Sequence, residues 1–265
     1  MRTIDFFNTH SVFSLNEAAR DLAPAGGRPG TVERLKYHLK AGRLKLVARG
    51  VYAVVPPGVP VKSFQPDPFL VAAAVRPDGV FSYHSALELL GAAHSVWTQY
   101  TLYVEQRRRP LRLDSTNIRF LEHPGPMRTA PCRKLGLRRV EYRRKLVQTT
   151  GPERTLIEGF RRPAEVGGLQ ELVNSAGGFA VLELDLLQEI LHCYDIANLW
   201  AAVGWFLERF RQSFHVTEGV LNQMAHHCPR APQYLERNRR DGVLASRWNL
   251  LLPKELVSFG EPDER

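Results

Sequence analysis

The sequence predicts an α+β protein in two parts, a small N-terminal part of short helices and a hairpin and a larger mixed α/β part that ends in helices. Three observations lead to this prediction. Helical patterns fill the first forty residues, and two alternating strand-like runs follow them directly. A proline-rich segment, 55–68, then interrupts the chain. We therefore expect an N-terminal domain over residues 1–58, a linker over 59–68 and a C-terminal domain over 69–265.

The first part contains three short helical patterns. Ser14 and Glu17 have the spacing of a capping box, in which each side chain bonds the other residue's backbone N–H, and this predicts a helix over 15–22. Thr31 is the expected N-cap of the next helix, 32–41. A further helix over 3–8 completes the three.

A β-hairpin follows these helices, in the stretch GRLKLVARGVYAVVP (42–56). Two alternating runs are joined at Arg49-Gly50, and Gly50 supplies the positive φ that a two-residue turn requires. Three helices followed by a hairpin are typical of a winged helix-turn-helix, in which the last helix enters the DNA major groove and the hairpin, or wing, lies along the backbone.

The polar face of the third helix and the hairpin supply the candidate DNA-binding residues. Val32, Leu35 and Leu39 share the apolar face of this helix, so the opposite face is left for contacts. An arginine there can bond guanine in two places, and hairpin cations can neutralise phosphates. The candidates are Arg28, Thr31, Arg34, Tyr37, His38, Arg43, Lys45 and Arg49. The alternative is a module of the same shape that contacts another protein.

Charge is distributed unevenly along the chain. Residues 1–60 hold 9 Lys and Arg against 4 Asp and Glu, and residues 61–150 hold 15 against 7. Residues 151–265 hold 12 against 16. A positive field confined to the front of the chain favours a polyanionic partner there.

Several stretches resemble one known family. GTVERLKYHLKAGRLKLVARGVYAV (30–54) resembles the N-terminal domain of AbiEi antitoxins, and FSYHSALELLG (81–91) resembles the helix after their linker. GPERTLIEGFRRPAEVGGLQELV (151–173) resembles their Arg-Thr-Leu helix and the Gly-Gly turn after it. The tail PRAPQYLERNRRDGVLASRWNLLLP (229–253) is similar to long members. One departure is APAGGRPG (23–30), which is longer than a standard helix-turn-helix turn.

The resemblance implies a bacterial antitoxin of a type IV toxin–antitoxin system. Such a protein binds double-stranded DNA at its own operator and represses its operon, and it opposes an AbiEii-type nucleotidyltransferase toxin. By position, the family's DNA-facing residues correspond to Arg28, Arg34, Tyr37, Arg43, Lys45 and Arg49. Trp205 lies off the apolar stripe of its predicted helix and is the candidate residue for toxin contact.

The sequence offers no catalytic residues and no cofactor site. No lysine has an acid two residues before it, the spacing by which restriction-type nucleases hold Mg²⁺, and no phosphate-binding loop is present. Adjacent residues such as His226, His227 and Cys228 point about 100° apart on a helix, so no metal site is expected. Two alternatives remain open, a ligand-responsive winged-helix transcription factor and a DNA-acting nuclease.

Cysteine usage and hydropathy indicate a cytoplasmic protein without a membrane segment. The three cysteines are odd in number and have no short spacing, which favours reduced thiols. No apolar run approaches the roughly 20 residues needed to span a bilayer, and the N-terminus lacks the apolar core of a signal peptide.

In the second part, strand-like runs cover 100–105, 117–121 and 140–142. Thr150 and Glu153 predict a second capping box, which opens a helix where Arg154 and Glu158 pair at i,i+4. The basic clusters at 107–109 and 143–145 are either solvated turns or a second contact to the DNA backbone.

Overall fold

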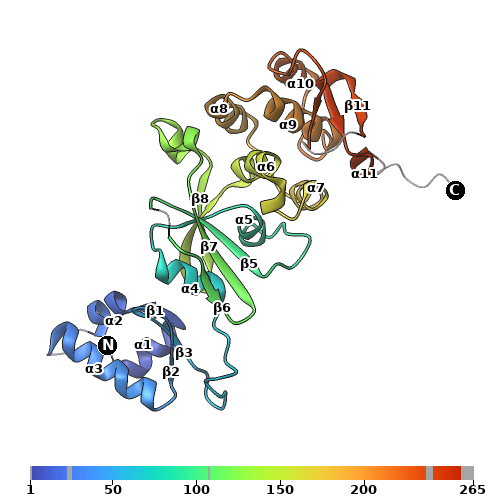
Figure 1. Cartoon of the computed structure of the whole chain (residues 1–265). Helices are drawn as coiled ribbons and strands as arrows, with labels where there is room; N and C mark the ends of the chain where they lie inside the picture. The colour runs from blue at the N-terminus through green and yellow to red at the C-terminus, as the bar shows by residue number, and fades with distance from the viewer. Residues whose placement is uncertain (1, 23–25, 107, 237–240, 258–265) are drawn as a thin grey trace. The chain divides into compact units, whose positions relative to one another are not determined.

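The computed structural model describes residues 2–22, 26–106, 108–236 and 241–257, and it has the mixed α+β character that the sequence predicts (Figure 1). The N-terminal elements are α1 (Thr3–Thr9), β1 (Val12–Ser14), α2 (Leu15–Leu22), α3 (Gly27–Lys40), β2 (Leu44–Ala48) and β3 (Val51–Val54). The central elements are α4 (Pro68–Val75), β4 (Val80–Phe81), α5 (His84–Leu89), β5 (Gln99–Val104), β6 (Leu111–Leu113), β7 (Thr116–Glu122), β8 (Leu137–Tyr142) and β9 (Lys145–Thr150).

The C-terminal half is mostly helical. Its elements are α6 (Pro152–Arg161), α7 (Leu169–Gly177), α8 (Leu184–Tyr194), α9 (Ala197–Arg209), α10 (Glu218–Ala225), β10 (Gln233–Tyr234), β11 (Val243–Ala245), β12 (Leu250–Leu252) and α11 (Lys254–Val257). Short 3₁₀ turns are η1 (Gly125–Arg128), η2 (Cys132–Lys134), η3 (Pro163–Glu165) and η4 (Ser246–Trp248). The described residues contain no helix with both the length and the apolar character needed to cross a bilayer.

The strands form three sheets. The N-terminal sheet has the order β1-β3-β2, and the C-terminal sheet has the order β10-β12-β11. The largest sheet has the order β6-β7-β5-β4-β9-β8, with β5 and β7 parallel and β6 and β7 antiparallel. The expected strands at 100–105, 117–121 and 140–142 correspond to β5, β7 and the end of β8.

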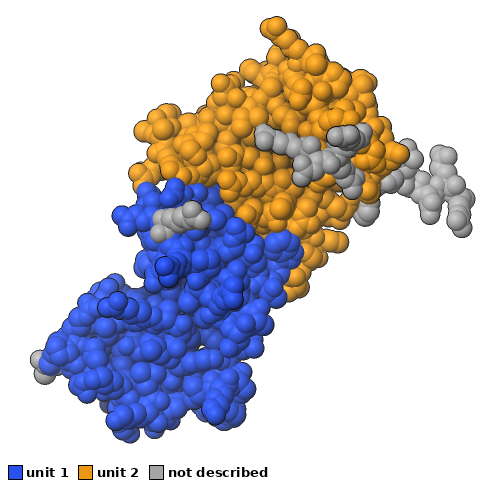
Figure 2. Space-filling view, viewed as in Figure 1, with its two compact units in different colours: residues 1–80, 97–122, 141–147 blue, residues 81–96, 123–140, 148–265 orange. Residues whose placement is uncertain are grey.

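The chain divides into two compact units, each drawn from separated segments of sequence (Figure 2). Unit 1 comprises 1–80, 97–122 and 141–147, and unit 2 comprises 81–96, 123–140 and 148–265. Unit 1 thus continues through the expected linker at 59–68 and takes in α4, which packs against β1 and β3.

The N-terminal elements share one hydrophobic core. Phe6 of α1, Phe13 of β1 and Leu35 of α3 are fully buried there. Further members are Ala18, Leu22, Leu44 and Tyr52, with Phe7, Leu15, Leu39 and Val54 packed at the margin. Aromatic side chains form the centre of this core. Phe6 and Phe13 meet edge to face with ring centroids 4.8 Å apart, and Phe13 stacks on Tyr52.

The predicted capping box at the start of α2 is confirmed. The Ser14 N–H donates to Glu17 Oε2 at 2.7 Å, and the Glu17 N–H donates to Ser14 Oγ at 3.2 Å. The second expected capping box is wrong. Gly151 is the N-cap of α6, while the buried Thr150 hydroxyl lies 2.7 Å from the hydroxyl of Thr155. The Glu153 carboxylate accepts from the Glu183 N–H instead.

The predicted start of the third helix is also wrong. α3 begins at Gly27, so Thr31 lies inside the helix, where it is fully buried and its hydroxyl donates to the Gly27 carbonyl at 3.1 Å. Gly27 has φ +57°, a left-handed value that glycine accepts without a steric penalty. Pro29 falls within the first turn, where a missing N–H leaves no hydrogen bond unmade.

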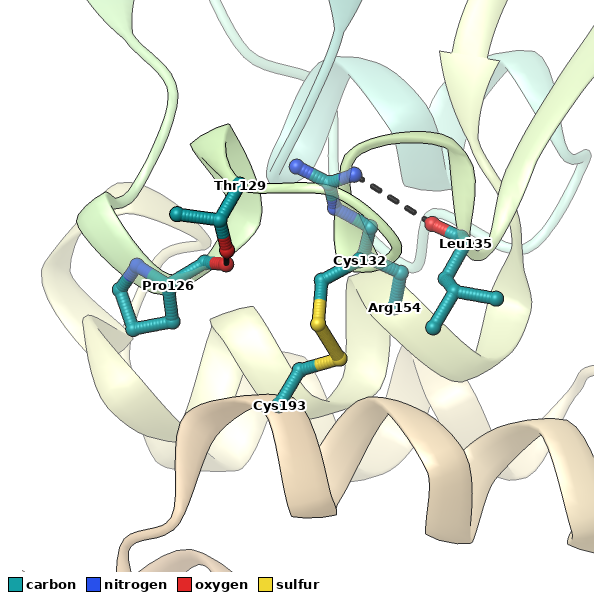
Figure 3. Close-up of a disulfide and its surroundings, with 6 residues drawn as sticks. All are labelled: Pro126, Thr129, Cys132, Leu135, Arg154 and Cys193. Atoms are coloured by element: carbon teal, nitrogen blue, oxygen red, sulfur yellow. Dashed lines mark hydrogen bonds between the residues drawn. A yellow bond between two sulfur atoms is a disulfide. The ribbon is translucent and has the colours of Figure 1, made fainter.

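A disulfide joins Cys132 to Cys193, which corrects the expectation of three reduced thiols (Figure 3). Cys132 lies in η2 and Cys193 on α8, and their Cα atoms are 6.1 Å apart although 61 positions separate them in sequence. The fold of unit 2 brings the two cysteines together, so their spacing in the sequence does not predict the bond. Cys228 is the free cysteine.

The long apolar stripe of α9 packs into the core of unit 2, and Trp205 packs with it. Trp205 is only 8% exposed, so its expected role as an accessible contact for a toxin is wrong. His227 stacks on Trp200, with ring centroids 4.3 Å apart, and His192 lies edge-on to both. Among the described residues, no group of three His, Cys, Asp or Glu side chains is placed to hold a metal ion.

Candidate nucleic-acid interface

The connection between α2 and α3 is shorter than the sequence implies. Because α3 begins at Gly27, only residues 23–26 separate the two helices, in place of the eight-residue break APAGGRPG. α2 and α3 pack against each other across the shared core. A connection of three or four residues is typical of helix-turn-helix motifs.

The exposed face of α3 presents two arginines and a tyrosine. The Arg28 guanidinium donates to the Asn16 side-chain carbonyl at 3.0 Å, and the Arg34 guanidinium reaches the Thr3 hydroxyl at 3.5 Å. Both partners are neutral, so both positive charges stay uncompensated by any carboxylate in the described part of the chain. Tyr37 is 62% exposed, which is unusual for a side chain of its size.

The hairpin after α3 presents two further cations. β2 and β3 pair antiparallel, with an irregularity between Leu46 and Ala48 just before the turn. Gly50 has φ +73°, as the predicted Arg49-Gly50 turn requires. Arg43 and Arg49 are exposed, and within the described ranges neither has a carboxylate partner.

Three of the expected contact residues face the interior or their own chain. Thr31 is fully buried. The Lys45 ammonium donates to the Phe64 carbonyl at 2.7 Å and lies 3.4 Å from an Asp114 carboxylate oxygen, so its charge is already balanced. His38 is buried against the ring of Phe7. The exposed candidates that remain are Arg28, Arg34, Tyr37, Arg43 and Arg49.

The environment of His38 also disfavours a phosphate contact. Burial lowers the pKa of His38 below its ordinary value of 6.5, and the positive charges of Arg43 and Arg34 lower it further. The imidazole is therefore neutral at pH 7. The position of His38 next to Tyr37 in the sequence does not predict this burial, because the imidazole ring is covered by Phe7 of α1.

One of the two basic clusters marked in the sequence, 143–145, lies near α2 in the folded chain. The turn between β8 and β9 belongs to unit 1, and its Lys145 ammonium lies 3.1 Å from a Glu17 carboxylate oxygen on α2. The sequence marks 143–145 as a basic cluster, but only the folded chain brings it to α2 across 128 positions. The other basic cluster includes Arg108 and Arg109, while Arg107 lies outside the described residues.

Comparisons with known proteins find structural similarity but assign no family. No protein-family model matches the chain, and no curated protein matches it. A crystal structure of the RV2827C protein from Mycobacterium tuberculosis aligns over 94% of this chain and 89% of its own, with 17% sequence identity and a TM-score of 0.60. At this identity the similarity establishes a shared fold.

Proposed function

We propose that residues 1–58 form a winged helix-turn-helix domain that binds double-stranded DNA with sequence preference. The observation that supports this proposal is the position of the unpaired cations. Arg28 and Arg34 lie on the exposed face of α3, and Arg43 and Arg49 lie on the hairpin that follows it directly. Uncompensated cations on a helix and an adjoining hairpin suit a groove lined by phosphates.

The exposed residues divide into base-reading and backbone-binding roles. Arg34 is at the middle of α3, where a helix in the major groove comes closest to the base edges, and its guanidinium can bond guanine O6 and N7 together. Tyr37 is one turn further along and contacts a phosphate or a thymine methyl. Arg43 and Arg49 bind phosphates and fix the register of the domain.

The resemblance to AbiEi antitoxins supplies the biological setting of the proposal. The DNA is the operator of the protein's own operon, which the protein represses, and the rest of the chain opposes an AbiEii-type nucleotidyltransferase toxin. This assignment derives from the stretches 30–54, 81–91 and 151–173. The protein itself acts by binding and supplies no catalytic step.

Fluorescence anisotropy tests the DNA-binding proposal directly. The purified chain is titrated into labelled duplex from its own upstream region and into a scrambled duplex, across a salt series. We expect tighter binding to the upstream duplex, with affinity falling as salt rises because phosphate contacts release counterions. Equal and weak binding to both duplexes would contradict sequence-specific recognition and leave only a basic surface.

Two variants separate the proposed roles. Arg34→Ala should cost about 1–3 kcal/mol on the upstream duplex and little on the scrambled one, because it removes a base contact. Arg49→Ala should weaken both duplexes alike and reduce the salt slope by about 0.9, because it removes a phosphate contact. Arg211→Ala in unit 2 is the matched control, since it removes the same charge outside the interface. Unchanged preference in Arg34→Ala would show that α3 is not the reading helix.

A second candidate function is a ligand-responsive transcription factor, which a cleft in unit 2 favours. The cleft has a volume of about 800 Å³, with Phe160, Leu199 and Leu235 as apolar lining and Arg161 and Arg162 as cations. That volume lies within the range of small-molecule sites. Expression of the neighbouring gene alone separates the two functions. Growth arrest that this chain relieves supports an antitoxin, and normal growth supports a ligand sensor.

A further inference from the structure

We infer that the turn between β8 and β9 is a second phosphate-binding element, which extends the DNA contact of the N-terminal domain. This inference rests on the proposed function, and it concerns Arg143 and Arg144, whose sequence position is about a hundred residues from the hairpin. The turn offers a contact surface separate from α3 and from the β2–β3 hairpin.

Two ion pairs hold the β8–β9 turn in unit 1, one to α2 and one to the start of α4. Lys145 lies 3.1 Å from Glu17 on α2, and the Arg143 guanidinium lies 3.1 Å from an Asp67 carboxylate oxygen. Asp67 is itself the N-cap of α4 and accepts from the Leu70 N–H and the Tyr142 hydroxyl. The turn is therefore held in one position relative to α2 rather than projecting freely into solvent.

The β2–β3 hairpin reaches the same end of α2. The Gly50 carbonyl accepts from the Leu15 N–H at 2.8 Å, and Leu15 is the first residue of α2. Arg49 therefore adjoins the first turn of the helix to which Lys145 is paired. Two basic turns from distant parts of the sequence therefore converge on the first turn of α2.

A small polar hollow lies beside this helix turn. Its volume is about 120 Å³, and its lining consists of Thr9, His10, Ser11, Val12, Glu17, Leu70, Arg143, Arg144 and Lys145. This volume suits a phosphate group and falls short of the 300 Å³ or more typical of sites for whole small molecules. The Glu17 carboxylate in the lining is already bonded to the Ser14 N–H and to Lys145.

Arg144 is the cation of this hollow that remains available. In the described part of the chain it has no carboxylate partner, whereas Arg143 and Lys145 are each paired. Arg143 and Arg144 both have positive φ, +47° and +66°, at turn positions where asparagine and glycine are favoured. Two arginines in such a turn carry a backbone cost, and a phosphate contact gives a physical reason for their presence.

Arg144→Gly provides a test that separates binding from folding. Glycine relieves the positive φ, so the variant should unfold at the same or a higher temperature than the wild type. Its DNA affinity should nevertheless fall equally on upstream and scrambled duplexes, and the salt slope should fall by about 0.9. Hydroxyl-radical footprinting on the upstream duplex should show protection lost at one edge only, with the centre unchanged.

The outcomes distinguish this inference from the proposed function. If Arg144→Gly leaves affinity, salt slope and footprint unchanged while Arg49→Ala weakens binding, the second contact is absent and the winged-helix proposal stands. If the wild type shows no preference for the upstream duplex, the proposed function itself fails. Arg211→Ala serves again as the charge control, and it should leave the footprint at full length.

Discussion

Glu17 links helix capping to a long-range ion pair within one side chain. One carboxylate oxygen accepts from the Ser14 N–H, and the other lies 3.1 Å from the Lys145 ammonium. Burial by itself raises the pKa of Glu17, but the Ser14 N–H and the Lys145 charge outweigh it and hold the pKa below its ordinary value of 4.5. The ionised form is therefore favoured in the folded protein.

This lowered pKa predicts a pH-dependent contribution to stability. Because the folded pKa lies below 4.5, the stabilisation is present above pH 4.5 and is lost as pH falls through the folded value. Glu17→Gln keeps an acceptor for Ser14 but removes the charge, so it should cost about 1 kcal/mol at pH 7. Urea unfolding should show that the difference in unfolding free energy between the wild type and Glu17→Gln disappears at acidic pH. Glu33→Gln, an exposed position, is the control, and a cost at Glu17 that persists in acid would exclude the ionic explanation.

Two pairs of residues with the same spacing in sequence differ in whether they form a helix cap. The Ser14–Glu17 cap is predictable because both partners lie within one helix turn. Thr150 and Glu153 have the same spacing, yet their side chains bond Thr155 and the Glu183 N–H. The difference is burial, because the second pair is inside unit 2, where partners from distant segments compete with the local pattern.

At the scale of elements, α6 is organised around a buried ion pair. Arg154 and Glu158 are both fully buried, with the guanidinium Nε donating to the carboxylate at 2.7 Å. The Tyr194 hydroxyl of α8 donates to the same carboxylate oxygen at 2.8 Å, and burial together with the Glu158 charge raises the pKa of Tyr194. A second Arg154 nitrogen donates to the Leu135 carbonyl. The i,i+4 spacing predicts the pair, but the residue pattern gives no sign of its burial.

Breaking this pair should destabilise the protein strongly. Arg154→Met leaves the Glu158 carboxylate buried without its cation, and we expect a loss of about 3–5 kcal/mol in the free energy of unfolding. Arg154→Met combined with Glu158→Leu should recover much of that loss, because no uncompensated charge remains. Urea denaturation of the single and double variants measures both values. A double variant as unstable as the single one would point to packing rather than charge.

In the N-terminal part of the chain, local sequence patterns predict which elements form but not the residues at which they begin. The β2–β3 hairpin is predictable because Gly50 and the alternating runs are local features. The start of α3 is not, because the Gly-Pro content of 26–30 reads as a break. In the folded chain Gly27 and Pro29 occupy the first turn, where their backbone properties are tolerated. This shift places Thr31 inside α3, where it is buried, and shortens the connection before α3.

At the scale of the molecule, the compact units do not follow the order of the sequence. Each unit gathers segments separated by tens of residues, and contacts such as Lys145–Glu17 form across 128 positions. Proline content marks 55–68 as a break in regular structure, but it gives no information on which later segments return to unit 1. For the same reason, the sequence does not predict the disulfide between Cys132 and Cys193.

The disulfide makes the stability of unit 2 sensitive to reductant. It closes a loop of about sixty residues that contains β8, β9 and α6, and on the chain-entropy account such a cross-link contributes about 4 kcal/mol. Thiol titration in denaturant should give one thiol per chain before reduction and three afterwards. Denaturant is needed because burial raises the pKa of the Cys228 thiol to about 11, which suppresses its reactivity in the native state.

Thermal unfolding with and without a thiol reductant then tests the role of this bond. The wild type and Cys228→Ser should both unfold at a lower temperature in reductant, because each keeps the Cys132–Cys193 pair. The double variant Cys132→Ser with Cys193→Ser should unfold at the same lower temperature under both conditions. The segment that holds Cys132 also contacts α6, because the Arg154 guanidinium donates to the carbonyl of Leu135, three residues after Cys132 (Figure 3). Reduction should also make the 123–136 segment more sensitive to protease, because it breaks the covalent link between η2 and α8. If the unfolding temperature of the wild type does not change with reductant, and three thiols titrate before reduction, the chain folds with its cysteines reduced.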